Sequence, residues 1–150
     1  MSMFSAFEIS GSALTAEKQR LDLVSSNLAN MNTTRTPDGG PYQRRTAVFA
    51  EKLDQARRNN PGSPLGRGDS GAQAGRGVQV NSIYADPAPP RVEYDPEHPD
   101  ADEEGYVEYP NVEVSREITD LITAQRSYES SSTAVNTAKD MYLKALEIGS

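Results

Sequence analysis

The residues best suited to hold a metal ion lie in an acidic segment in the second half of the chain. Asp100 and Asp102 belong to a run of carboxylates that ends at Gly105, which is the spacing at the start of a calcium-binding loop. Such a loop ends on a bidentate carboxylate at its twelfth position, but that position is Asn111. The pattern favours an acidic β-turn closed by Gly105. The alternative function is a small calcium- or ligand-binding module that uses the acidic loop 95–104.

No other pattern of reactive side chains indicates catalysis. His98 is the only histidine, and it lies among carboxylates and prolines with no serine nucleophile pattern around it. The glycines of residues 66–71 match the spacing of a dinucleotide-binding loop, but no strand is predicted before them and no helix after them. The chain has no cysteine, which excludes thiolate catalysis and zinc sites built on cysteine. We therefore expect no enzyme activity and no cofactor.

Composition narrows the class of protein further. The chain has 150 residues and a net charge of −7, which argues against general binding to nucleic acid. Hydrophobic residues make up 35% of the chain, so we expect a small core. No apolar run approaches the roughly 18 residues of a membrane-spanning helix, so no insertion into a membrane is expected. The first residues do not resemble a cleaved secretory signal.

A helix is predicted at each end of the chain. The first helix is predicted from about residue 10 to residue 29, with a looser lead-in from residue 3, because apolar side chains recur at every seventh position on one face. Gly11 weakens its first turns, and Pro37 with the glycines after it prevents its continuation. Its apolar stripe, which we expect to contact other subunits, consists of Phe7, Leu14, Leu21, Val24, Leu28 and Met31.

The helix at the C-terminal end is predicted to begin after Pro110, with Asn111 or Ser115 as its cap. Its longer apolar stripe, also expected to contact other subunits, consists of Val114, Ile118, Leu121, Ile122, Tyr128, Val135, Tyr142 and Leu146. A second apolar row on another face indicates more than one neighbour. No third long helix is predicted to cover the outer faces of the pair, so we expect both helices to need other chains for stable packing.

The segment between the helices, residues 37–110, is predicted to be a small β-rich region. Short runs of β-branched and aromatic residues predict strands at 46–49, 78–84, 92–94 and 106–109. Residues 59–77 are rich in glycine and are expected to form a flexible loop. The predicted fold class is mainly α with a small β middle. Helical assembly segments 1–36 and 111–150 pair as a coiled coil, with a short β-hairpin region and long loops between them.

The segment at the end of the first helix is more specific than any of these patterns. It reads Ser-Asn-Leu-Ala-Asn-Met-Asn-Thr over residues 26–33, and its asparagines suit a helix end that turns into a structured loop. It resembles the signature shared by the bacterial flagellar rod and hook proteins. In most of that family Gly-Tyr follows directly, whereas here residues 34–41 precede Tyr42. That departure resembles the proximal rod members of the family.

The C-terminal half of the chain supports the same resemblance. It reads Gly-Tyr-Val-Glu-Tyr-Pro-Asn over residues 105–111 and Gln-Arg-Ser-Tyr over residues 125–128. The similar segments together cover about residues 5–50 and 92–150. The positions that carry the family motif are Asn27, Asn30, Asn32, Pro37, Tyr42, Gly105, Tyr106, Pro110 and Asn111.

The resemblance implies a structural subunit of the flagellar basal-body proximal rod. Members of this family polymerise through their terminal helices into a tubular drive shaft that transmits torque and conducts exported subunits. The implied partners are other copies of the chain in a helical assembly, other proximal and distal rod proteins, the rod adaptor at the inner-membrane MS ring and the flagellar type III export apparatus. The implied location is the rod where it crosses the periplasm, reached by export without a cleaved signal peptide.

Overall fold

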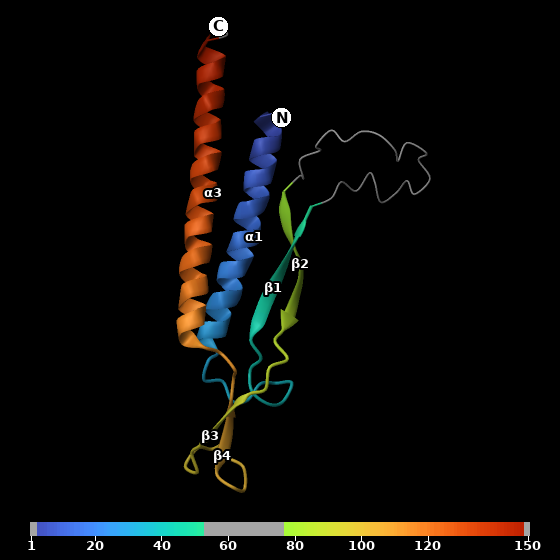
Figure 1. The fold of residues 1–150 in the computed structure, drawn as a ribbon, viewed down its shortest axis with the longest axis vertical. Helices are drawn as coiled ribbons and strands as arrows, with labels where there is room; N and C mark the ends of the chain where they lie inside the picture. The colour runs from blue at the N-terminus through green and yellow to red at the C-terminus, as the bar shows by residue number, and fades with distance from the viewer. Residues whose placement is uncertain (1–2, 53–76, 149–150) are drawn as a thin grey trace, which may run out of the picture.

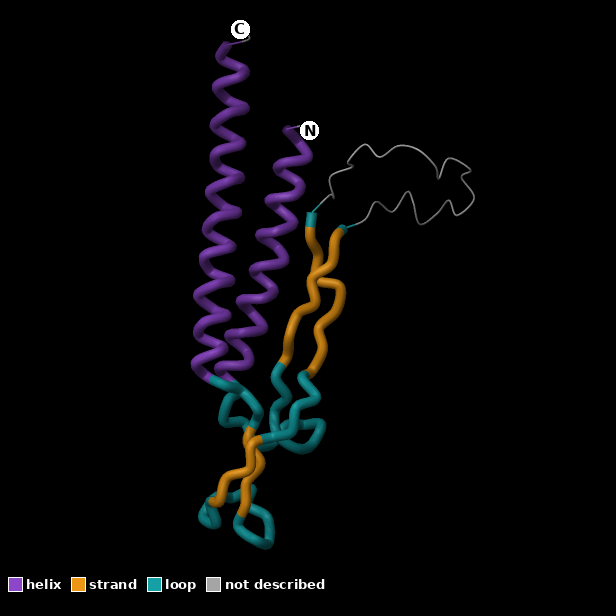
Figure 2. Tube along the Cα trace, viewed as in Figure 1, coloured by secondary structure: helices purple, strands orange, loops and turns teal. Residues whose placement is uncertain are grey.

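The computed structural model describes residues 3–52 and 77–148 of the chain. Two long helices lie side by side, a two-stranded sheet lies along the first of them, and a second small sheet projects from the base of the helices (Figure 1). The elements are α1 (Met3–Ala29), β1 (Arg45–Glu51), β2 (Val78–Ala85), β3 (Arg91–Tyr94), β4 (Tyr106–Tyr109) and α3 (Val114–Ile148). This arrangement confirms a mainly α fold with a small β middle, and Figure 2 shows how loops join the two parts.

The two predicted helices are present, and both differ from the prediction at their N-terminal ends. α1 begins at Met3 instead of near residue 10. Its early turns have a partner that the sequence pattern does not reveal, because Nζ of Lys52, directly after β1, lies 3.8 Å from Oε1 of Glu8. α3 begins at Val114, so both predicted caps are wrong: Asn111 lies too far before the helix, and Ser115 lies inside it.

The side of α1 that is most buried is not the side richest in leucine. Ala16 and Val24 are buried, with 2% and 6% of their surface exposed, and Asn27 is completely buried. On α3 the buried residues are Glu117 and Ala124. Small and polar side chains therefore occupy the deepest positions of the two packed helices, which brings the backbones close together.

The predicted strands form two separate antiparallel sheets. β1 pairs with β2 from Arg45 opposite Ala85 to Glu51 opposite Val78, with an irregularity between Val48 and Phe49. β3 pairs with β4 as a short hairpin. The four strand predictions are thereby confirmed, and β1, β2 and β3 are longer than predicted. The predicted flexible loop 59–77 and the glycine pattern at 66–71 lie outside the described residues, apart from Gly77, which directly precedes β2.

The acidic segment before β4 forms the turn that its sequence favours. Oδ1 of Asp102 accepts hydrogen bonds from the backbone amides of Glu104 and Tyr106, at 2.9 and 2.8 Å. Gly105 has φ +84°, where an added Cβ would lie 2.9 Å from the ring of Tyr94. Among the described residues no three His, Cys, Asp or Glu side chains gather as metal ligands do. Neither described helix has the length and hydropathy that crossing a membrane requires.

Candidate assembly surfaces

The most connected residue of the asparagine segment is Asn27, whose side chain joins three parts of the chain. Its Nδ2 donates to the backbone oxygen of Arg45 at 2.9 Å and to Oε2 of Glu117 at 3.0 Å. Its Oδ1 accepts from the backbone amide of Arg45 at 2.9 Å and from the hydroxyl of Tyr42 at 3.0 Å. Every hydrogen-bonding position of this buried amide is therefore used, as burial requires.

The charge of Glu117 is neutralised by Arg44, which precedes β1. Nε of Arg44 donates to Oε1 of Glu117 at 2.6 Å, and both side chains are almost completely buried. The guanidinium also donates to the hydroxyl of Thr46 at 2.8 Å and approaches Asp120 at 3.4 Å. Such a pair is tolerated in a low-dielectric environment because hydrogen bonds satisfy both ions. We call Asn27, Tyr42, Arg44 and Glu117 the junction cluster.

The other motif residues near the end of α1 shape the loop that follows the helix. Nδ2 of Asn30 donates to the backbone oxygen of Ser26 at 2.8 Å, and its Oδ1 accepts from the hydroxyl of Thr33 at 3.2 Å. The backbone amide of Tyr42 donates to the backbone oxygen of Thr33 at 3.0 Å, which closes the loop. Asn32 and Pro37 are exposed. Asn27 and Asn30 therefore lie at the end of α1, where the sequence predicts a helix that turns into a structured loop.

The C-terminal motif residues lie apart from the junction cluster, in and after the β3–β4 hairpin. Gly105 and Pro110 are buried, while Tyr106 and Asn111 are exposed. The ring of Tyr106 contacts the ring of Tyr94 edge-on, with centroids 5.3 Å apart. The family motif thus corresponds to two structural positions, one at the junction of helices and sheet and one in the hairpin.

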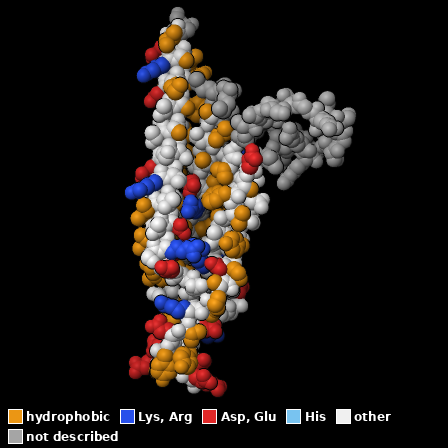
Figure 3. Space-filling view, viewed as in Figure 1, with side chains coloured by type: hydrophobic (Ala, Val, Ile, Leu, Met, Phe, Trp, Pro, Cys, Tyr) orange, Lys and Arg blue, Asp and Glu red, His pale blue; other side chains and the backbone are white. Residues whose placement is uncertain are grey.

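The predicted apolar stripes are incompletely covered within one chain. On α1, Val24 is buried, and the remaining stripe residues are half-buried: Phe7, Leu14, Leu21, Leu28 and Met31. On α3, Leu121 and Val135 are half-buried. The other α3 stripe residues have 38–53% of their surface exposed: Val114, Ile118, Ile122, Tyr128, Tyr142 and Leu146. Hydrophobic side chains are visible along the flank of the helices in Figure 3.

The C-terminal end of α3 exposes a group of large apolar side chains. α3 has 35 residues and α1 has 27, and α3 continues past the N-terminal end of α1 (Figure 1). The exposed large apolar residues near that end are Met141, Tyr142, Leu143, Leu146 and Ile148. Exposed apolar area gathered in this way is typical of a surface that another chain covers.

The β1–β2 sheet also exposes large apolar side chains, none of which belongs to the predicted stripes on the helices. Val48 and Phe49 on β1 and Ile83 and Tyr84 on β2 have 37–52% of their surface exposed. The alternation of side chains along a strand does not predict this exposure. It does not say whether another element covers one face of the sheet or neither face.

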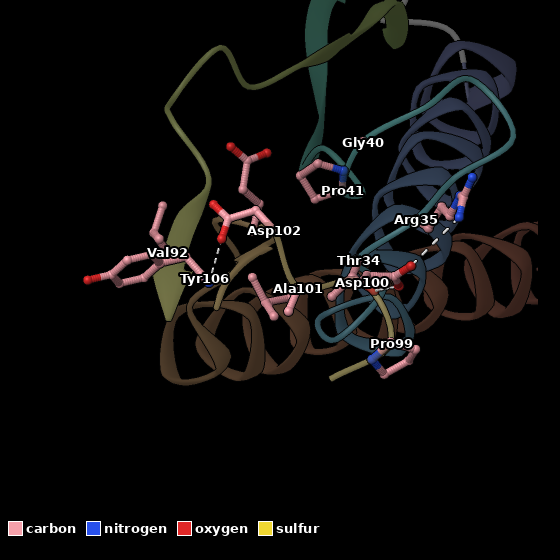
Figure 4. A pocket seen from close by; sticks show the side chains of 12 residues that line it. Thr34, Arg35, Gly40, Pro41, Val92, Pro99, Asp100, Ala101, Asp102 and Tyr106 are labelled. Carbon is pink, nitrogen blue, oxygen red and sulfur yellow. Dashed lines mark hydrogen bonds and ion pairs between the residues drawn. The ribbon is translucent and has the colours of Figure 1, made fainter. Parts of the chain in front are cut away.

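An open hollow of about 600 Å³ separates the loop after α1 from the β3–β4 hairpin (Figure 4). Across it, the hydroxyl of Thr34 donates to Asp100 at 2.8 Å, and Nη1 of Arg35 lies 3.8 Å from the same carboxylate. The lining is mixed, and the carboxylate of Asp102 is already engaged by its own turn. Among the described residues that line the hollow, no group of side chains is arranged to hold a metal ion.

Comparison with known proteins identifies related sequences across the whole chain. The family model described as "Flagella basal body rod protein" matches residues 7–35, and that described as "Flagellar basal body rod FlgEFG protein C-terminal" matches residues 103–148. The flagellar basal-body rod protein FlgC of Bacillus subtilis is 44% identical over 99% of this chain and 99% of its own length. The protein of the same name from Borreliella burgdorferi is 43% identical over 99% and 98%, and that from Escherichia coli O157:H7 is 39% identical over 99% of both.

Proposed function

This chain belongs to the family of FlgC flagellar basal-body rod proteins, and we propose that its terminal helices build the proximal rod by packing against those of neighbouring subunits. It is a structural subunit of the rod, it associates with other rod components, and it is not an enzyme. The proposal concerns which surfaces make these associations and what they achieve.

The observation that carries the proposal is the exposed apolar flank of α3. Ile118, Ile122 and Tyr128 each expose between 38% and 47% of their surface, although they lie on a helix that is packed on another side. Burying each in a neighbouring subunit contributes about 1 kcal/mol or more, and the number of subunits multiplies this gain. In the assembly the pairing of α1 with α3 takes coiled-coil geometry, in which a seven-residue repeat keeps one stripe facing its partner.

The division of the chain follows from these surfaces. Segments 1–36 and 111–150 form the helical assembly parts, and residues 37–110 form the β-rich part. The junction cluster holds the two parts in one orientation. In the tube the helices transmit torque along the axis, because close-packed interiors deform little.

The location and the finer partners are part of the same proposal. The rod crosses the periplasm, the subunit reaches it through the flagellar type III export apparatus without a cleaved signal peptide, and the first subunits meet the rod adaptor at the MS ring. Distal rod proteins follow at the other end. Similarity to FlgC proteins over nearly the full length of both chains supports these assignments.

The experiment replaces the chromosomal gene with single-residue variants and images purified basal bodies by electron microscopy. Ile122→Asp places a charge on the exposed flank, so we expect a folded, exported chain but membrane rings without a rod, as in a gene deletion. Thr123→Asp, at the adjacent exposed position, is the matched control and should give complete rods. Complete rods and normal swimming in the Ile122→Asp strain would exclude this flank as an assembly surface.

A further inference from the structure

The seam between α1 and α3 contains a repeat that permits more than one pairing. On α3, Glu117, Ala124, Ser131 and Ala138 follow one another at intervals of seven residues. Ala124 is completely buried, and Ser131 and Ala138 are half-buried. Since small side chains at successive heptads present nearly the same surface, α1 meets similar packing if it is displaced by one heptad along α3.

The lengths of the helices allow this displacement in one direction. α3 is the longer helix, with 35 residues against 27, and its surplus lies beyond the N-terminal end of α1 (Figure 1). A displacement of α1 by seven residues toward the C-terminal end of α3 therefore keeps α1 covered along its length. It shifts the helices by about 10 Å relative to each other.

Few polar contacts join the loop after α1 to the β3–β4 hairpin, so they give limited resistance to such a shift. Within the described part of the chain, the hydrogen bond and the ion pair between the loop after α1 and the β3–β4 hairpin both end on Asp100. An open hollow of about 600 Å³ separates the two segments (Figure 4). The hairpin, which leads directly into α3, is thus joined to the α1 side by few polar contacts.

The junction cluster distinguishes the observed pairing from the displaced one. Asn27 belongs to α1, and Arg44 is attached to α1 because Asn27 bonds to both backbone groups of Arg45. In the observed pairing both meet the carboxylate of Glu117. After a displacement of one heptad they would meet Ala124 instead. A buried guanidinium and a buried amide would then lack their acceptor, which is strongly unfavourable.

We infer that Asn27, Arg44 and Glu117 determine the register in which α1 pairs with α3, while the apolar residues supply only attraction. Polar residues buried in a helix seam are known to specify register in this way. The inference concerns pairing inside one chain, and only its consequence for the rod rests on the proposed function. That consequence is that every copy presents the flank of α3 at the same height relative to α1.

Cysteine cross-linking tests the register directly, because the chain has no cysteine of its own. The observed register is reported by Arg20→Cys with Asp120→Cys, because the guanidinium of Arg20 lies 3.5 Å from the carboxylate of Asp120. The displaced register is reported by Arg20→Cys with Ser127→Cys, one heptad further along α3, in a chain that also carries Asp120→Ser so that both chains lack this carboxylate. Each pair is joined by a short bis-maleimide reagent, which spans the gap left by the shorter cysteine side chains, in the purified full-length chain. Intrachain products are separated from dimers by size. The cluster is then replaced by Asn27→Leu, Arg44→Met and Glu117→Leu together.

We expect the unaltered cluster to give the 20–120 cross-link with about a tenth or less of the 20–127 product. The apolar triple variant should keep its helical circular dichroism and give both products in comparable yield. Equal yields or no cross-link with the unaltered cluster would overturn the inference, as would a triple variant that forms only the 20–120 product. Rod assembly plays no part in this readout, so failure here is distinguishable from failure of the proposed function.

Two further variants keep the test decisive. If the triple variant loses its helical circular dichroism, Glu117→Gln is measured, because it keeps the side-chain size and removes the charge. A several-fold rise in the 20–127 product supports the inference, and an unchanged ratio overturns it. The control is Arg91→Met with Glu93→Leu, which removes an exposed ion pair of 3.5 Å far from the seam. It should leave the ratio of the two products unchanged, and a change as large as that of the triple variant would overturn the inference.

Discussion

Nδ2 of Asn27, near the end of α1, donates a 3.0 Å hydrogen bond to Oε2 of Glu117, which lies 90 residues later in the first turn of α3. The other oxygen of that carboxylate accepts a 2.6 Å hydrogen bond from Arg44. One buried carboxylate therefore joins both helices and the start of the β1–β2 sheet. This makes the base of the helix pair the most interdependent part of the molecule.

Replacing Asn27 should destabilise the chain more than replacing any other asparagine of the motif. Asn27→Ala leaves the hydroxyl of Tyr42, both backbone groups of Arg45 and the carboxylate of Glu117 without this partner. We expect the free energy of unfolding to fall by about 3 kcal/mol, measured by urea denaturation of the purified chain. Asn32→Ala, at an exposed position, serves as the control and should change it by less than about 0.5 kcal/mol. Equal effects of the two substitutions would refute the role given to Asn27.

Arg44 and Glu117 should be strongly coupled in a double-mutant cycle. Arg44→Met leaves the buried carboxylate of Glu117 without its counterion, and Glu117→Leu leaves Arg44 with only the longer contacts to Asp120 and Asp86, so each should cost about 3–5 kcal/mol. The double variant leaves neither charge, so it should cost far less than the sum of the two. Urea denaturation of the three variants measures the coupling. Additive losses would mean that the two side chains act independently, despite the 2.6 Å contact.

Two glycines should respond to alanine with opposite sign. Gly77 has φ +113°, and a Cβ placed on it would lie 2.0 Å from the hydroxyl of Ser12. Gly77→Ala should lower the free energy of unfolding by about 1–3 kcal/mol, because both the backbone and Ser12 must adjust. Gly11 lies within α1 with open space around it, so Gly11→Ala should raise stability by up to about 1 kcal/mol. Thermal unfolding of both variants checks the two signs, and a stable Gly77→Ala variant would contradict the close approach of β2 to α1.

The uncovered end of α3 should matter for assembly and not for folding of the single chain. Leu146 has 53% of its surface exposed, so Leu146→Asp should leave the helical circular dichroism unchanged. If other subunits cover this end, the strain should lose its rods and stop swimming. Thr137→Asp adds the same charge at an exposed polar position and should swim normally. Normal rods in the Leu146→Asp strain would show that this end stays uncovered in the assembly.

Much of the fold follows from the sequence by itself. The seven-residue recurrence of Leu14, Leu21 and Leu28 predicts the first helix, and runs of β-branched residues predict the four strands. Both predictions use only the backbone preference and the side-chain period of a short segment. The asparagine segment around Asn27 and Asn30 predicts a helix end and supports the family resemblance. These features depend on residues close together in the chain.

Only the tertiary structure decided which faces pair and which polar groups hold them. Nothing local marks Glu117 as buried, since a glutamate in the first turn of a helix ordinarily favours the helix end and faces water. Its burial depends on Arg44 and Asn27, which approach it from 73 and 90 residues away. Likewise, the pattern on α3 marks Ile122 as apolar, but only the position of α1 leaves it exposed. The period of apolar side chains indicates that one face of a helix or strand must pack against another element. Which element packs there depends on contacts between distant parts of the chain.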